Sequence, residues 1–168
     1  ALAGILIEVQ QKVFGYLNAI EQKMIDEATL SEMILFLTEK LNIEISSDFD
    51  MFTFENKISK IKELLDRPIR VCGMVKNEGE PGGGPFWVMS DKGIKSLQIV
   101  EMSQVDLSDK KQSKILAEAT HFNPVDLVCG IKNYKGEKFA LKQFVDQKSG
   151  FIVEKSVEGK PVKSYELP

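Results

Sequence analysis

The sequence has few of the residues that metal and redox sites require. Its 168 residues include two cysteines and one histidine. The cysteines form no CxxC pair, and a single histidine falls short of the usual zinc ligand sets, so we expect no zinc site. Cys72 and Cys129 each lie in an apolar run typical of a strand, which predicts buried free thiols rather than a disulfide. Free thiols indicate a reducing, cytoplasmic setting.

Strong positive charge and long apolar runs are also missing. The formal net charge is -3 and the isoelectric point about 5.4, whereas a nucleic-acid binder needs a basic face for phosphate contacts. Lys110, Lys111 and Lys114 fall on one predicted helix and are typical of a solvated face. Charge at Glu8 and Lys12 interrupts the opening apolar residues too early for a membrane span. We therefore expect neither nucleic acid nor a membrane as a partner.

An initiator methionine and a polar tail are absent too, which predicts that the chain is a segment of a longer protein. A chain of this length can bury roughly 70% of the surface that its unfolded form exposes, so one domain with a conventional core is feasible. If the segment is incomplete, part of its active site lies in another stretch of that protein.

Residues 1–66 have the apolar spacing of helices, three and four residues apart. The pattern predicts a helix from Leu2 to about Ile25 and a third helix over 54–65. A capping box at Thr29–Glu32 predicts that the second helix starts there. We expect these residues to form a helical segment that packs on a core made by the strands.

Residues 67–168 have the alternating pattern of strands, punctuated by turns. Ser108 is expected to cap one helix that ends near Glu118. The fold class expected is therefore α/β, with a twisted mixed sheet covered by at least one helix. We expect the chain to be organised around Arg67–Asp106, which holds both glycine clusters and the tryptophan. Strands are predicted over 69–75, 85–89, 95–102, 125–131, 151–155 and 162–165.

The loop 78–85 joins two predicted strands and contains three consecutive glycines, Gly82 to Gly84. Such a loop can cradle an anion or let the backbone approach a ligand. It matches neither GxxxxGK[ST] nor GxGxxG before a helix. Glu78 and Glu80 would repel a phosphate unless a cation lay between them. A mobile hairpin loop without a ligand is the alternative interpretation.

Two polar residues stand at strand ends. Glu101 ends an apolar strand, where a carboxylate often faces the ligand crevice of an open α/β sheet; the alternative is a surface carboxylate. Asn123 precedes Pro124 at a helix-to-strand junction, and the alternative there is a simple turn. His121 is the lone histidine and is expected to be structural, so no Ser/His/Asp set is predicted.

The order of these sites resembles sugar-1-phosphate nucleotidyltransferases, in particular N-acetylglucosamine-1-phosphate uridylyltransferase. The stretch 71–75 resembles the family's glycine-bearing strand, 99–101 resembles its strand ending Ile-Val-Glu, and Asn123 resembles the asparagine that opens its next strand. The resemblance implies a Rossmann-like sheet in which the backbone at Gly73 approaches the sugar. It implies that Glu101 and Asn123 hydrogen-bond the sugar hydroxyls or the N-acetyl group.

The stretches 74–88 and 121–139 also resemble the carboxyl-terminal part of an uncharacterised family of longer bacterial proteins. In that family the amino-terminal half has a loop similar to the nucleotide-binding loop of nucleotidyltransferases, and no such loop stands in this sequence. The resemblance implies that this chain supplies the sugar-phosphate side of a site and is inactive alone, while the other half binds the nucleoside triphosphate. Mg²⁺ is expected for the full-length protein, with no ligand identified in this segment. A lid is expected from Glu80, Gly82, Gly83 and Gly84.

The sequence departs from the enzymes at one site residue, because Pro follows Asn123 where they have Thr-Gly. Two alternatives therefore stay open. The first is a non-catalytic module that binds a sugar nucleotide or carbohydrate. The second is a structural domain whose helices dock a partner chain.

Overall fold

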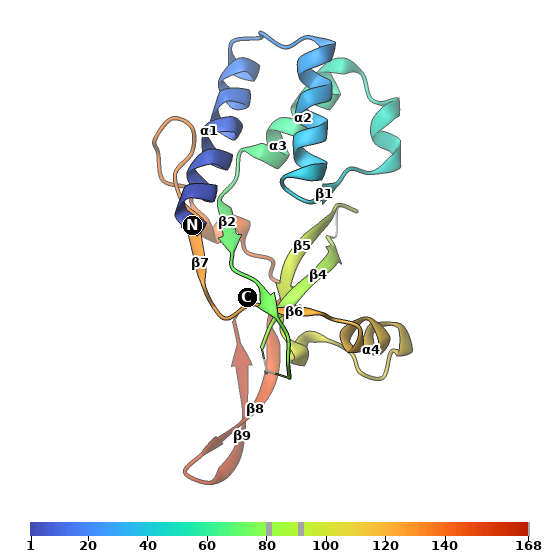
Figure 1. Ribbon diagram of the computed structural model, residues 1–168, viewed down its shortest axis with the longest axis vertical. Helices are drawn as coiled ribbons and strands as arrows, with labels where there is room; N and C mark the ends of the chain where they lie inside the picture. Colours follow the sequence, from blue (N-terminus) through green and yellow to red (C-terminus); the bar gives the residue numbers. More distant parts are fainter. Residues whose placement is uncertain (80–81, 91–92, 168) are drawn as a thin grey trace.

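The computed structural model describes residues 1–79, 82–90 and 93–167. Figure 1 shows a helical part at one end, short strands in the middle and a long hairpin at the other end. The structure is therefore mixed α and β, as predicted. The helical part comprises α1 (Leu2–Glu21), α2 (Glu27–Glu39), β1 (Ile43–Glu44), the 3-10 turn η1 (Ser47–Met51) and α3 (Phe54–Leu65).

The buried apolar core of the described residues lies entirely in this helical part. Met33, Leu37 and Ile61 are 0% exposed, and every other buried apolar side chain also precedes residue 66. The prediction that the strands of Arg67–Asp106 form the organising core is therefore wrong. Narrow sheets of two or three strands have too few layers to enclose side chains, whereas three packed helices enclose a core between them.

Side-chain caps determine where the helices begin. The carboxylate of Asp26 accepts a hydrogen bond from the backbone N–H of Thr29 at 2.8 Å, so α2 starts at Glu27. The predicted start at Thr29 is late because Asp26 already supplies an acceptor for the first turn. Thr53 caps α3, whose predicted span of 54–65 is confirmed.

The strand-rich part forms small sheets instead of one twisted sheet. Its elements are β2 (Ile69–Cys72), β3 (Val75–Lys76), β4 (Gly84–Met89), β5 (Lys95–Val100), η2 (Met102–Gln104), α4 (Lys110–Ala117), β6 (His121–Phe122), β7 (Leu127–Gly130), η3 (Leu141–Phe144), β8 (Phe151–Val157) and β9 (Lys160–Glu166). Within the described ranges the sheets are β1-β5-β4, β2-β7, β3-β6 and β8-β9, and every pair is antiparallel. The expected helix, α4, starts after Asp109 rather than Ser108 and buries no side chain, so it does not cover a sheet.

The helical part is joined to the strands along α1. This helix lies beside β2 and β7. Gly130 is buried there because the side chain of Gln10 occupies the space that a Cβ would need. Lys135, in the loop after β7, donates to the carboxylate of Glu21 at 2.6 Å. These contacts attach the first helix to the strand-rich part.

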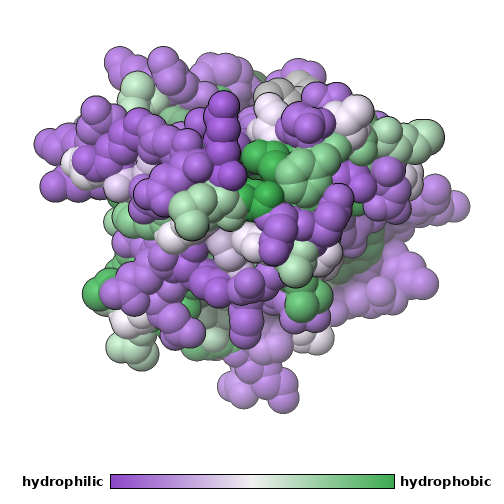
Figure 2. Space-filling model, turned by 90° about the horizontal axis from the view of Figure 1, so that it is seen from above, coloured by the Kyte–Doolittle hydropathy of each residue, from purple (hydrophilic) through white to green (hydrophobic). Residues whose placement is uncertain are grey.

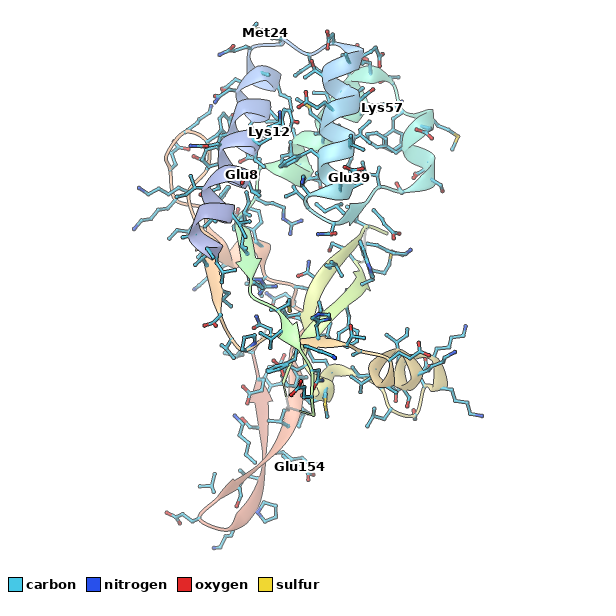
Figure 3. The ribbon with its side chains drawn as sticks, viewed as in Figure 1. Glu8, Lys12, Met24, Glu39, Lys57 and Glu154 are labelled. Carbon is cyan, nitrogen blue, oxygen red and sulfur yellow. The ribbon has the colours of Figure 1, made fainter. Side chains whose placement is uncertain are left out.

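The hairpin β8–β9 projects from the rest of the molecule. Its turn, Glu158–Gly159, has φ values of 50° and 79°, which match the type I′ turn that suits a two-residue hairpin loop. Glu154 lies on β8, in the projecting hairpin below the strands (Figure 3). The surface at the helical end is different, because hydrophilic residues there surround a small apolar patch (Figure 2). No described helix has the length and apolar character needed to cross a bilayer.

The helical core predicts a large difference between two leucines of α2. Leu37→Ala is expected to lower the free energy of unfolding by about 2–5 kcal/mol, because it leaves a cavity in a fully buried position. Leu35→Ala is the matched control, since Leu35 is 54% exposed and its truncation should change stability by less than about 1 kcal/mol. Urea unfolding followed by circular dichroism measures both. Equal losses for the two variants would contradict the placement of the core.

Candidate functional site

The site predicted from the sequence lies where two strand pairs are interrupted. Cys72 is opposite Leu127 in β2–β7, and Val75 is opposite Phe122 in β3–β6. Two residues on one side, 73–74, therefore face four on the other, 123–126. An insertion of this kind breaks the ladder and leaves backbone groups without strand partners.

The side chain of Asn123 replaces the missing ladder. Its amide nitrogen donates to the carbonyl of Gly73 at 2.6 Å and to that of Asp126 at 3.4 Å. Its amide oxygen accepts from the backbone N–H of Val125 at 3.1 Å. Asn123 is 7% exposed and is the one buried polar side chain of the described residues. An amide fits because it donates and accepts at once.

Val125 shows that this junction is strained. Its φ of 68° lies in the left-handed region, which is rare for a β-branched residue, and its side chain is 80% exposed. Such a conformation costs of order 1–3 kcal/mol and persists only where surrounding contacts hold it. The hydrogen bond from Val125 N–H to Asn123 is one such contact.

Gly83 joins the same place from the loop before β4. The backbone N–H of Asn123 donates to the carbonyl of Gly83 at 2.8 Å. A Cβ on Gly83 would lie 2.7 Å from Ile99 Cγ2 and 2.8 Å from Glu101 Oε1. The absence of a side chain at Gly83 therefore lets the Glu101 carboxylate lie against the backbone.

Glu101 is held by a reciprocal cap at the start of η2. Its carboxylate accepts from the backbone N–H of Gln104, and the Gln104 side chain accepts from the backbone N–H of Glu101 at 2.8 Å. Gln104 Nε2 also donates to the carbonyl of Ser149 at 2.7 Å, which ties this turn to the segment before β8. No role for Gln104 is predicted from the sequence, although its spacing of three from Glu101 is that of a capping box.

The structure thus brings the predicted site residues together from four separate segments. Asn123 hydrogen-bonds both Gly73 and Gly83, and Glu101 lies against Gly83, which the sequence predicts only as part of a lid. Gly83 and Gly84 are buried, and Gly84 begins β4, so these two form the floor of the site rather than a cover. Gly82 is exposed beside Phe122, and Glu80 lies outside the described residues.

The polar side chains at this site can accept hydrogen bonds from a ligand. The Glu101 carboxylate has no ion pair with a described residue and keeps acceptor capacity beyond its cap. Asn123 uses both amide hydrogens within the chain, so its side chain positions the backbone and keeps only one lone pair for a ligand. The site suits hydroxyl or amide donors, and a phosphate would need a cation from elsewhere.

The other reactive residues lie outside this site or have local partners. Cys72 is half-buried, and burial raises the pKa of its thiol. Cys129 is exposed on the open β2–β7 pair, so the prediction that both thiols are buried is wrong for Cys129. His121 Nδ1 hydrogen-bonds the hydroxyl of Thr120 at 2.8 Å. No three His, Cys, Asp or Glu residues of the described ranges gather as metal ligands would.

Removing the Asn123 amide should destabilise the whole junction. Asn123→Ala leaves the Gly73 carbonyl and the Val125 N–H without their partner, while the Asp126 carbonyl keeps the hydrogen bond from the Gly73 N–H, so the free energy of unfolding is expected to fall by about 2–3 kcal/mol. Asn123→Asp should be at least as damaging at pH 7, because a carboxylate would face the Gly73 carbonyl. Asn56→Ala, an exposed helical control, should have little effect. Chemical unfolding tests the series, and an Asn123→Ala variant as stable as the control would exclude the bracing role.

Filling the space at Gly83 should displace the carboxylate of Glu101. Gly83→Ala is expected to cost about 1–3 kcal/mol through overpacking against Ile99. Gly4→Ala is the control, since nothing lies within 4 Å of its Cβ position and alanine favours the helix. Thermal unfolding and amide NMR shifts at 101–104 measure the two effects. Unchanged shifts in Gly83→Ala would show that the contact with Glu101 is absent.

Comparison with known proteins gives a family but no function. The whole chain, residues 1–168, matches the model of a family described as a domain of unknown function, DUF4301. No curated protein and no solved structure matches the chain. Because the family model matches every residue, this chain belongs to the DUF4301 family.

Proposed function

We propose that this chain forms the sugar-phosphate side of a sugar-1-phosphate nucleotidyltransferase. The observation that carries the proposal is the convergence of Gly73, Gly83, Glu101 and Asn123 at one junction, from segments far apart in the sequence. A structural linker would have no need to orient a carboxylate that has no ion pair beside a strained residue. Proteins store strain of this kind preferentially at functional sites.

The proposed roles follow from the contacts. Glu101 accepts hydrogen bonds from the sugar hydroxyls or the N-acetyl N–H, and its cap with Gln104 orients the carboxylate before the ligand arrives. The two glycines allow close packing at the junction, because Asp126 Cβ lies 3.4 Å from the Cβ position of Gly73 and Glu101 Oε1 lies 2.8 Å from that of Gly83. Asn123 is a positioning residue that holds both glycines in place through its side chain and its backbone N–H.

The reaction proposed is attack of a sugar-1-phosphate oxygen on the α-phosphorus of a nucleoside triphosphate, with loss of pyrophosphate. We place the triphosphate on the amino-terminal half of the same protein, which would also complete a Rossmann-like sheet beside these strands. Mg²⁺ assists such transfers by neutralising phosphate charge. The described residues do not gather the acidic ligands that a Mg²⁺ site needs. A cytoplasmic setting, where both substrates occur, fits this function.

The second candidate is a module that binds a sugar nucleotide or carbohydrate without turnover. This candidate is favoured because Asn123 donates both amide hydrogens to backbone carbonyls of the chain. Glu101 is then the main polar side chain left to contact a ligand. The two functions share the site and differ only in whether the full-length protein releases pyrophosphate.

The proposal is tested first by binding and then by turnover. N-Acetylglucosamine 1-phosphate added to the 168-residue chain should shift the amide NMR signals of 73, 83 and 101–104. Glu101→Gln should weaken this binding about 10-fold or more through loss of a charged acceptor. Glu8→Gln, which changes an exposed carboxylate on α1 (Figure 3), should leave it unchanged.

Pyrophosphate release separates the remaining interpretations. The full-length protein should release pyrophosphate from a nucleoside triphosphate and a sugar 1-phosphate, and the 168-residue chain alone should not. Binding without release by the full-length protein would favour the non-catalytic module. A dissociation constant of about 10 mM is the weakest that this titration detects, so the absence of any shift at that concentration of sugar phosphate would reject the site itself.

A further inference from the structure

The outer face of the β4–β5 hairpin is apolar, which is unusual for a sheet face in water. The register pairs Trp87 with Leu97 and Pro85 with Ile99, and these four side chains share one face. Trp87 is 51% exposed and Leu97 36%. A half-buried antiparallel sheet normally shows polar residues to solvent, so this face is expected to be covered by another surface.

The contacts on the opposite face of the hairpin show that the face with Leu97 is the one not covered by the protein. Ile43 of β1 pairs with Ser96, is 8% exposed and belongs to the helical core. Its neighbour Glu44 pairs with Lys95 and is exposed. Since neighbouring residues alternate between faces, the face of Ser96 points into the protein and the face of Leu97 points away from it.

The total exposed area agrees with an uncovered interface. The chain exposes 11751 Å². A compact protein of 18.9 kDa exposes about 8,300 Å², so this chain exposes roughly 40% more. A standard interface removes about 800 Å² from each partner. The excess is larger than this area, but it is summed over the whole chain, including the projecting hairpin β8–β9, so it permits a dimer interface without locating it.

We propose that this outer face is the interface between two copies of the chain. The order of residues along it is self-complementary. Lys95 lies at one end, the apolar pairs lie in the middle, and Glu101 lies beyond the other end, beside Gly83. A two-fold axis through the middle of the hairpin puts Lys95 of one copy against Glu101 of the second copy, and the reverse contact forms at the other end.

The same rotation matches the side chains by size and charge. It lays the pair Trp87–Leu97 of one copy over Pro85–Ile99 of the other, so that a large aromatic ring meets a small proline. Lys95 already binds Glu44 at 2.6 Å, but an ammonium group has three donors and can bridge two carboxylates. Facing sheets pack about 10 Å apart, which these side chains can fill.

The dimer adds a consequence for the candidate site, and this consequence rests on the proposed function. Among the described residues, no lysine or arginine contacts Glu101 in a single copy. Lys95 of the second copy brings a cation to the edge of that site, where a sugar phosphate would need one. The oligomeric state can be measured without any ligand, so failure of the dimer proposal can be told apart from failure of the proposed function.

Sedimentation equilibrium of the 168-residue chain measures the proposed interface. The chain should sediment as a dimer at micromolar concentration. Leu97→Glu places like charges at the centre of the interface and should raise the dissociation constant about 100-fold or more. Gln98→Glu is the matched control. It adds the same charge one residue along β5, but the Gln98 side chain points to the opposite face of the hairpin, where it accepts a hydrogen bond from Arg70. Circular dichroism confirms that both variants fold.

Charge reversal tests the antiparallel arrangement specifically. Lys95→Glu alone and Glu101→Lys alone each put like charges together and should weaken the dimer about 10-fold. An equimolar mixture of the two variants restores both opposite-charge contacts and should dimerise as well as the unchanged chain. A monomeric chain at 100 µM, taken as about the concentration limit for a specific dimer, would overturn the proposal. A dimer insensitive to Leu97→Glu would overturn it too.

Discussion

The hydrogen bonds of one buried amide hold the strand-rich part together. Asn123 is the place where β2–β3 and β6–β7 lose register, and its side chain satisfies the backbone groups that this loss leaves unpaired. Its backbone N–H also anchors Gly83, so the loop before β4 depends on it. A buried donor or acceptor that loses its partner costs more free energy than the formed hydrogen bond contributes. The stability of this junction is therefore sensitive to substitution of Asn123.

The two parts of the chain are stabilised by different forces. The helical part buries Val13, Leu17, Met33, Leu37 and Ile61 almost completely, so apolar burial dominates there. After residue 66 the described residues with the least exposure are Gly83, Gly84, Asn123 and Gly130, none of which has an apolar side chain to bury. The strands therefore rely on backbone hydrogen bonds and on α1, which leaves their apolar side chains available to other surfaces.

The sequence predicts single elements well and their assembly poorly. The helix at 54–65 depends on neighbouring residues, which a local pattern contains. The pairing of strands depends on partners far along the chain, so the sequence predicts one sheet where the described residues form four small ones. Asn123 and Glu101 were identified by residue type and position, but the role of Gly83 follows only from its distance to Glu101.

The electrostatic character of the site connects the proposed function with the proposed dimer. Glu101 offers a carboxylate that accepts a hydrogen bond from the backbone N–H of Gln104 but has no opposing charge among the described residues of a single copy. Such a site favours neutral hydroxyl groups and repels phosphate. The proposed ligand, a sugar phosphate, has both kinds of group, so one chain would recognise only half of it. In the proposed dimer the second copy places Lys95 beside the carboxylate, so that the sugar hydroxyls meet the acceptor Glu101 and the phosphate meets the cation Lys95.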